Sequence, residues 1–361
     1  MLPTLSALLV QNRFSRAAKR LQRVEFKDWI PRDAMTSENH QAFSAMVGTN
    51  PRRKVLPTLL LAGSVLIGFA ALYLHLTFGR PVGSGPAGPM LDRSPFAHVW
   101  TSRPVFLVGL GDSVTFGFGA RRGYGYFDRL VSNPPDEFPE MKGICLSSVL
   151  PHLTTTNLSV SGSISLELAE SQLPLLPTND PGTLVWVVIT TGGNDLIHNY
   201  GRTPPREQAM YGATWEQSQP WINKFGRRLD EIMARLSAKF SGGCEVFLAN
   251  IYDPTDGVGD VQRAGLPAWS DGSKVLNAYN ETIRHCAEAH SNVHLVNFHD
   301  AFLGHGIHCA QFWSKHYHSN DPHYWYFANL EDPNERGYDA IRRLFLQEMV
   351  KAGQRLQVDA R

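Results

Sequence analysis

Residues 105–113 read VFLVGLGDS, in which the unbroken apolar run VFLVGL at 105–110 is followed by Gly-Asp-Ser. Short continuous apolar runs of this kind are typical of strands buried on both faces of a parallel sheet. Three later stretches have the same character and are also predicted as strands. They are LVWVVITT at 184–191, CEVFLAN at 244–250 and VHLVNF at 293–298.

The sequence between and after these runs predicts helices. The clearest helical patterns cover residues 221–240, 273–290 and 336–352. Because predicted strands alternate with predicted helices, we expect a three-layer α/β/α domain with a parallel sheet over residues 95–361.

Residues 1–94 differ from this domain and predict three segments. Residues 1–54 are polar and basic, which predicts a disordered cytoplasmic tail, with Met46 as an alternative start of translation. Residues 55–78 contain no Asp, Glu, Lys or Arg, so we predict a transmembrane helix over 55–79; a buried core helix is the alternative. Residues 80–94 are rich in Pro and Gly, which is typical of a flexible linker.

Charged residues around the apolar run predict its orientation. Arg52, Arg53 and Lys54 precede the run, whereas only Arg80 follows it closely. Positive flanking residues stay in the cytoplasm, so we expect a single-pass protein whose large domain is periplasmic or extracellular.

Composition gives no sign of a nucleic-acid partner. The chain has 361 residues and a formal net charge of +1, and it contains no nucleic-acid-binding motif. Its four cysteines have no Cys-x-x-Cys spacing, which argues against a zinc ribbon or a thioredoxin-type site. Outside the cytoplasm they would form one or two disulfides, with four buried free thiols as the alternative. The sequence does not predict the oligomeric state.

Polar and glycine residues follow the predicted strands. Ligands of open α/β sheets bind at the carboxyl ends of strands. GDS at 111–113 and GGND at 192–195 each follow a strand, and NLSVSG at 157–162 ends a shorter apolar segment between them. A serine at a strand-to-helix turn is exposed and suits a nucleophile. Taken singly, these residues would also suit a helix cap and ordinary turns.

In order and position, these motifs resemble the sequence blocks of the SGNH (GDSL-like) hydrolase family, over about residues 103–350. The resemblance implies a flavodoxin-like α/β/α fold and serine esterase activity. It implies Ser113 as the nucleophile. It also implies that the backbone N–H groups of Ser113 and Gly162 and the side-chain amide of Asn194 would hold the oxyanion.

The general base departs from the family pattern. That pattern is Asp-x-x-His followed by Pro-Asn, whereas this chain has Asn329 and Asp332 at the two positions. An unassisted Asp with a pKa near 4 is a poor base for a serine hydroxyl. We therefore predict that His323 is the base and that Asp332 orients it. A packing role for His323 is the alternative, and the other candidate bases are His305, His316 and His318.

Nine of the 14 histidines lie between residues 285 and 323. Some of them, together with one cysteine, offer enough ligands for zinc, but their spacing matches no named motif. We therefore predict no metal and no cofactor. Aromatic residues between 312 and 327 are predicted to line the pocket, with core packing as the alternative. The candidate zinc ligands are His305, His308, Cys309, His316 and His318.

These observations predict a membrane-anchored, extracytoplasmic serine ester hydrolase. The expected substrates are acyl or acetyl esters of a small molecule, a lipid or a glycan. Because Asn329 and Asp332 replace the expected base pair, a non-hydrolytic binding protein is one alternative. An acyltransferase that acts on a glycan or a lipid is another.

Overall fold

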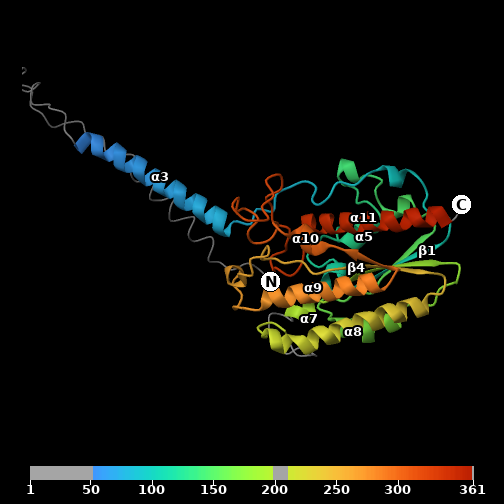
Figure 1. Ribbon diagram of the computed structural model, residues 1–361. Coiled ribbons are helices and arrows are strands. Elements are labelled where there is room, and N and C mark those ends of the chain that lie inside the picture. The colour runs from blue at the N-terminus through green and yellow to red at the C-terminus, as the bar shows by residue number, and fades with distance from the viewer. Residues whose placement is uncertain (1–51, 198–209, 360–361) are drawn as a thin grey trace, which may run out of the picture. The chain divides into compact units, whose positions relative to one another are not determined.

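The computed structural model describes residues 52–197 and 210–359. The chain divides into two compact units, Met1–Gly68 and Phe69–Arg361, and the second contains an α/β domain (Figure 1). The predicted disordered tail of residues 1–54 lies almost wholly outside the described residues.

Helix α3, Arg52–Phe78, contains the predicted membrane span. Within the described part of the chain, it is the one helix long and apolar enough to cross a membrane, over Leu59–Phe78. Large apolar side chains such as Leu66 and Ile67 are exposed along it. A continuous exposed apolar surface of this kind is typical of contact with lipid or with another protein.

A five-stranded parallel sheet forms the centre of the described domain (Figure 1). Its strand order is β2-β1-β3-β4-β5, which is the flavodoxin-like doubly wound order, and the predicted fold class is confirmed. The strands are β1 Val105–Gly111, β2 Leu153–Asn157, β3 Leu184–Thr190, β4 Cys244–Ala249 and β5 Val293–Val296.

Strand β2 is the one strand of this sheet that the apolar pattern did not predict. Its sequence is LTTTN, and its side chains are exposed or half-buried because it pairs only with β1, at the edge of the sheet. The four predicted strands have the sequence pattern of buried strands, and β1 and β3 are buried along their whole length.

Helices cover both faces of the sheet because successive strand side chains point to opposite faces. Trp186 and Val188 belong to the core under α5 and α11, whereas Val187 and Ile189 belong to the core under α8 and α9 (Figure 1). The longer domain helices are α8 Trp215–Lys239, α9 Gly272–Ala289 and α11 Glu335–Asp359. The shorter ones are α4 Ser113–Phe116, α5 Tyr126–Val131, α6 Ser165–Glu167, α7 Gly193–Ile197 and α10 Phe298–Phe302.

Residues 80–94, predicted as a flexible linker, make specific contacts with the domain. The Tyr324 N–H donates to the carbonyl of Pro81 at 2.7 Å. The N–H of Ala87, a buried residue, donates to Asp339 Oδ2 at 3.0 Å. Arg336 also donates to the carbonyl of Ser84 at 2.6 Å. Backbone groups make these contacts, so the Pro/Gly-rich composition does not reveal them.

The cysteines are free thiols. Burial raises the pKa of the Cys244 thiol to about 12, which keeps it protonated near neutral pH. Of the two alternatives left open by the sequence, the structure therefore has the buried thiols. They are Cys145, Cys244, Cys286 and Cys309.

Candidate active site

Ser113 begins helix α4, two residues after the end of strand β1. Gly111 makes this approach possible, because a Cβ at that position would lie 1.9 Å from the carbonyl oxygen of Thr190 on β3. Its φ of 117° also favours glycine. The switch in strand order between β1 and β3 therefore places Ser113 where open α/β sheets bind their ligands.

Asp112 fixes the turn that carries Ser113. Its Oδ1 accepts hydrogen bonds from the Val114 N–H at 3.1 Å and from Thr190 Oγ1 at 2.7 Å. The Thr190 hydroxyl is also hydrogen-bonded to the Thr115 hydroxyl, with the two oxygens 2.7 Å apart. The Thr115 hydroxyl is in turn hydrogen-bonded to the Tyr126 hydroxyl at 2.6 Å. Burial raises the pKa of Asp112 to about 7. The turn is thus held by a buried polar chain rather than by exposed contacts.

Gly162 lies in a turn after strand β2, and Asn194 lies in helix α7 after strand β3. Gly162 has a φ of 83°, and its N–H makes no hydrogen bond to any described residue. Asn194, in α7, donates from Nδ2 to the carbonyl of Ser163 at 3.0 Å. An amide nitrogen has two donors, so this bond orients Asn194 and leaves one N–H for a ligand.

Gln172 joins the end of strand β1 to the turn that contains Gly162, and sequence reasoning missed it. It donates to the carbonyl of Gly111 at 2.8 Å and to Ser163 Oγ at 3.0 Å, and it accepts from the Gly111 N–H at 2.8 Å. Asp195, in α7, accepts from the Ser165 N–H at 2.8 Å. A lone Gln far from the motifs gives no signal in the sequence, whereas Asp195 belongs to the GGND block.

Asp332 lies beside Ser113, and Asn329 holds it. The Asp332 side chain is buried, and its Oδ2 accepts from Asn329 Nδ2 at 2.6 Å. Its Oδ1 is buried without a well-aligned hydrogen-bond partner among the described residues. Burial raises the pKa of the Asp332 carboxyl, while the Ser113 and Asn329 side chains act to lower it through hydrogen bonding. A carboxylate therefore occupies the position where the family pattern has a histidine.

Asn334 positions the segment that carries Asp332. Its Oδ1 accepts from the N–H groups of Arg336 and Gly337, both at 3.0 Å, and so caps helix α11. Its Nδ2 donates to the carbonyl of Tyr324 at 2.7 Å. Gly337 is needed here because a Cβ would lie 2.3 Å from the carbonyl oxygen of Trp325.

His323 has a different carboxylate partner from the one predicted. We expected Asp332 to orient it, but its Nδ1 lies 2.5 Å from Asp321 Oδ1. Asp321 also pairs with Arg336 at 2.5 Å. The imidazole packs against Gly83, where a Cβ would lie 2.4 Å from the ring. One side of the His323 ring is therefore in contact with the segment 80–94.

Three other histidines of this region, His305, His308 and His318, have contacts of their own. His305 stacks on Trp325 with ring centroids 3.5 Å apart, and burial lowers the pKa of His305 to about 4. His308 lies 2.8 Å from Asp260 Oδ1, and His318 lies 2.9 Å from the carbonyl of Leu303. In the described part of the chain, the five candidate zinc ligands do not converge on one point.

Ser113 lines a pocket, together with Asp112 and Asn194. The apolar part of the lining includes Leu196, Ile197, Leu266, Trp269 and Leu276. No histidine lines it among the described residues. The predicted lining by aromatic residues from 312–327 is wrong, because Tyr324, Trp325 and Tyr326 are packed in the core and Phe312 and Trp313 are exposed.

Comparison with protein families gives one match. The model of the GDSL-like Lipase/Acylhydrolase family matches residues 110–340. These residues include Ser113, Gly162, Asn194 and Asp332. None of the curated proteins matches the chain.

Several solved structures are similar to this chain. An extracellular lipase from Streptomyces rimosus is 17% identical, with a TM-score of 0.45 over 68% of this chain and 99% of that chain. A variant of an acetyl xylan esterase from Geobacillus stearothermophilus is 16% identical, with a TM-score of 0.43 over 70% and 97%. Phospholipase A1 from Streptomyces albidoflavus NA297 is 19% identical, with a TM-score of 0.42 over 69% and 100%.

Proposed function

The chain belongs to the GDSL-like lipase/acylhydrolase family, as its motifs predict, and from this premise we propose that it hydrolyses carboxylic esters through an acyl-enzyme on Ser113. The observation that carries the proposal is that Ser113 interacts with the Asp332 carboxyl and also lines a largely apolar pocket. Ser113 and Asn194 on the lining suit a scissile ester, and the apolar lining residues suit an acyl or alkyl group.

We propose Asp332 as the general base because its surroundings are complementary to a carboxylate. A histidine base needs an acceptor behind it, which an aspartate provides. A carboxylate base needs a donor behind it, and Asn329 Nδ2 is such a donor at 2.6 Å. The two departures from the family pattern, Asn329 and Asp332, therefore fit each other. Burial favours this role because it raises the pKa of Asp332 and so strengthens it as a base.

The proposed reaction has two steps. Ser113 Oγ attacks the ester carbonyl while its proton passes to Asp332, and Asp332 then gives that proton to the leaving alkoxide. Water releases the acyl group from Ser113 by the same route in reverse. The N–H groups of Ser113 and Gly162 and the free N–H of Asn194 Nδ2 stabilise the oxyanion in both steps.

The sequence predicts His323 as the base and we propose Asp332; one set of variants distinguishes the two. Hydrolysis of p-nitrophenyl acetate is measured with the full chain in detergent. Ser113→Ala should abolish turnover, and Asp332→Asn should lower kcat by about 10²–10⁴-fold, the usual contribution of a general base. His323→Gln should change kcat by less than about threefold, like the exposed control His285→Gln.

The opposite pattern would assign the base to His323. In that case His323→Gln would lose activity and Asp332→Asn would keep most of it. A well-folded wild-type chain with no activity above Ser113→Ala would contradict ester hydrolysis itself and favour a binding protein or an acyltransferase.

We also propose that helix α3 anchors the enzyme in a membrane, with the catalytic domain outside the cytoplasm. The charge-free length of Leu59–Phe78 supports a span. The basic residues before it, Arg52, Arg53 and Lys54, support a cytoplasmic N-terminus. The substrate would then be an acyl or acetyl ester of a lipid, a glycan or a small molecule outside the cytoplasm.

A further inference from the structure

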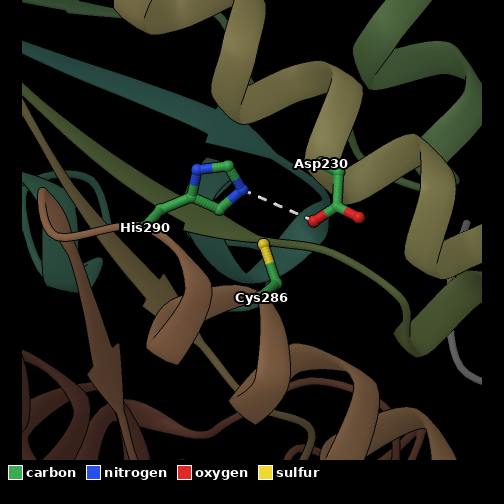
Figure 2. Close-up of side chains that lie close together, drawn as sticks. All are labelled: Asp230, Cys286 and His290. Carbon is green, nitrogen blue, oxygen red and sulfur yellow. Dashed lines mark hydrogen bonds and ion pairs between the residues drawn. The ribbon is translucent and has the colours of Figure 1, made fainter.

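Asp230, Cys286 and His290 bring a carboxylate, a thiol and an imidazole together on the face of the sheet covered by α8 and α9. Figure 2 shows the three side chains pointing toward a common centre. Their ligand atoms all lie within 4.8 Å of one another. None of the three lines the pocket beside Ser113, so the catalytic proposal does not account for this cluster.

Two helices hold the cluster in place. Asp230 lies in α8, Cys286 lies in α9, and His290 is the residue that follows α9. Cys286 and His290 are four residues apart, so they lie on the same side of the helix, one turn from each other. The packing of α8 against α9 brings Asp230 to that side (Figure 2).

We propose that Asp230, Cys286 and His290 bind one zinc ion, with a water molecule as the fourth ligand. Thiolate, imidazole and carboxylate are the three protein ligands that zinc uses. A sulfur and a nitrogen donor disfavour calcium and magnesium, which prefer oxygen ligands.

The distance between the imidazole and the carboxylate suits a tetrahedral ion. Zinc binds imidazole nitrogen and carboxylate oxygen at about 2.0–2.2 Å, which places these two atoms about 3.4 Å apart in a tetrahedral site. His290 Nε2 and Asp230 Oδ1 lie 3.4 Å apart. This separation is long for a hydrogen bond but equals the edge of such a tetrahedron. The Cys286 sulfur needs to lie about 3.6 Å from each of them, because zinc–sulfur bonds are about 2.3 Å long.

The charge of the three ligands and their access to solvent also suit a zinc ion. A thiolate, a carboxylate and a neutral imidazole together neutralise a divalent ion. The metal-free Cys286 is a buried free thiol, and a free cysteine thiol is mostly protonated near neutral pH. Binding therefore breaks the S–H bond, forms a Zn–S bond and releases one proton to solvent, without oxidation or reduction. Asp230 is exposed, which gives the ion a path from solvent.

The site would act as a clip between two helices. It joins the end of α9 to α8, and the sheet separates both helices from α5 and α11 (Figure 1). We therefore expect zinc to stabilise this layer of the fold. Ester hydrolysis does not require it.

The test uses the full, untagged chain in detergent after treatment with EDTA. Zinc alone is titrated by isothermal calorimetry in two buffers of different ionisation enthalpy, which counts released protons. We expect one zinc ion and one released proton per chain. Cobalt in place of zinc should give a thiolate-to-cobalt charge-transfer band and the intense visible bands of a tetrahedral site.

Variants assign the ligands. Asp230→Asn, Cys286→Ser and His290→Gln should each weaken zinc binding by at least tenfold and abolish the rise in unfolding temperature that zinc causes. The matched controls Cys244→Ser and His285→Gln should bind zinc as the wild type does. Asp230 is exposed, so its variant should keep the fold, which circular dichroism in EDTA verifies. Absence of zinc binding by the wild type would overturn the proposal. Full binding retained by Asp230→Asn and His290→Gln would do the same.

Discussion

Asp332 is a buried carboxylate whose pKa depends on its two neighbours. Burial raises that pKa, and the Ser113 and Asn329 side chains counteract the rise because they donate to the charged form. The proposed base must be ionised to accept the Ser113 proton. Activity should therefore fall as pH drops through the pKa of Asp332, and the identity of residue 329 should set the position of this fall.

Asn329→Asp tests this dependence. The substitution replaces a donor with a second carboxylate 2.6 Å from Asp332, which raises the pKa of Asp332 further. The acidic limb of the kcat/KM profile should move to higher pH by at least one unit, measured with p-nitrophenyl acetate. An unchanged acidic limb would show that Asp332 does not titrate in the reaction.

Asp112→Asn should change the way stability depends on pH. The folded pKa of Asp112 is about 7, above its ordinary value of 3.8. Its contribution to stability is therefore fully present below pH 4 and is lost as pH rises to 7, at up to about 1.4 kcal/mol per pH unit. Asparagine keeps an acceptor for Val114 and Thr190 but does not titrate.

Thermal unfolding of the wild type and of Asp112→Asn at pH 5 and pH 8 checks this expectation. The variant should gain stability relative to the wild type between the two pH values. The same difference in melting temperature at both pH values would contradict a raised pKa for Asp112.

At the scale of elements, the start of helix α11 connects the fold to the site. Asn334 caps this helix and, through its Nδ2, also ties it to the preceding segment at Tyr324. Asp332 lies two residues before this cap. The placement of Asp332 beside Ser113 therefore depends on the point where α11 begins.

Asn334→Ala should destabilise the domain and reduce activity together. Loss of a helix cap costs about 1–2 kcal/mol, and the carbonyls that Asn334 Nδ2 satisfies would add to this cost. Urea unfolding measures the change in the free energy of unfolding. Asn277→Ala, at an exposed position within α9, is the control and should change stability by less than about 0.5 kcal/mol.

Buried strands and amphipathic helices were predictable from the sequence because burial leaves a pattern in it. β1 and β3 are continuous apolar runs, and their ends lie within one residue of the prediction. Strand β2 was missed because its Thr-rich sequence at the sheet edge lacks that pattern. Contacts of residues 80–94 were missed because they are made by backbone atoms.

The site was predictable only in part. The motifs predicted Ser113, Gly162 and Asn194 because each comes after a strand in the family order, and their catalytic roles stay predictions. The partner of His323 was not predictable, since nearness in sequence placed it with Asp332 whereas the folded loop pairs it with Asp321. Gln172 was missed because its role depends on contacts between segments far apart in the chain.

At the scale of the whole molecule, the proposed anchor can be tested by fractionation. We expect the full chain to stay with membranes through washes with high salt and alkaline carbonate, and to be released by detergent. Replacing Leu66 and Ile67 by Arg should weaken insertion, because each central Arg costs about 2.5–3.5 kcal/mol. Protease added to intact cells should digest the catalytic domain if it lies outside the cytoplasm. Release of the wild type by carbonate would contradict the span.

The contact between Asn329 and Asp332 also constrains how this sequence can have evolved. A gene that moves between Asp-x-x-His and Asn-x-x-Asp must pass through Asp-x-x-Asp or Asn-x-x-His. The first intermediate places two carboxylates 2.6 Å apart, and the second leaves an imidazolium without its acceptor. Both intermediates should be poor enzymes, so single mutations should rarely convert one pair into the other. Chains with the Asn-x-x-Asp pair should therefore descend together as a separate branch of the family.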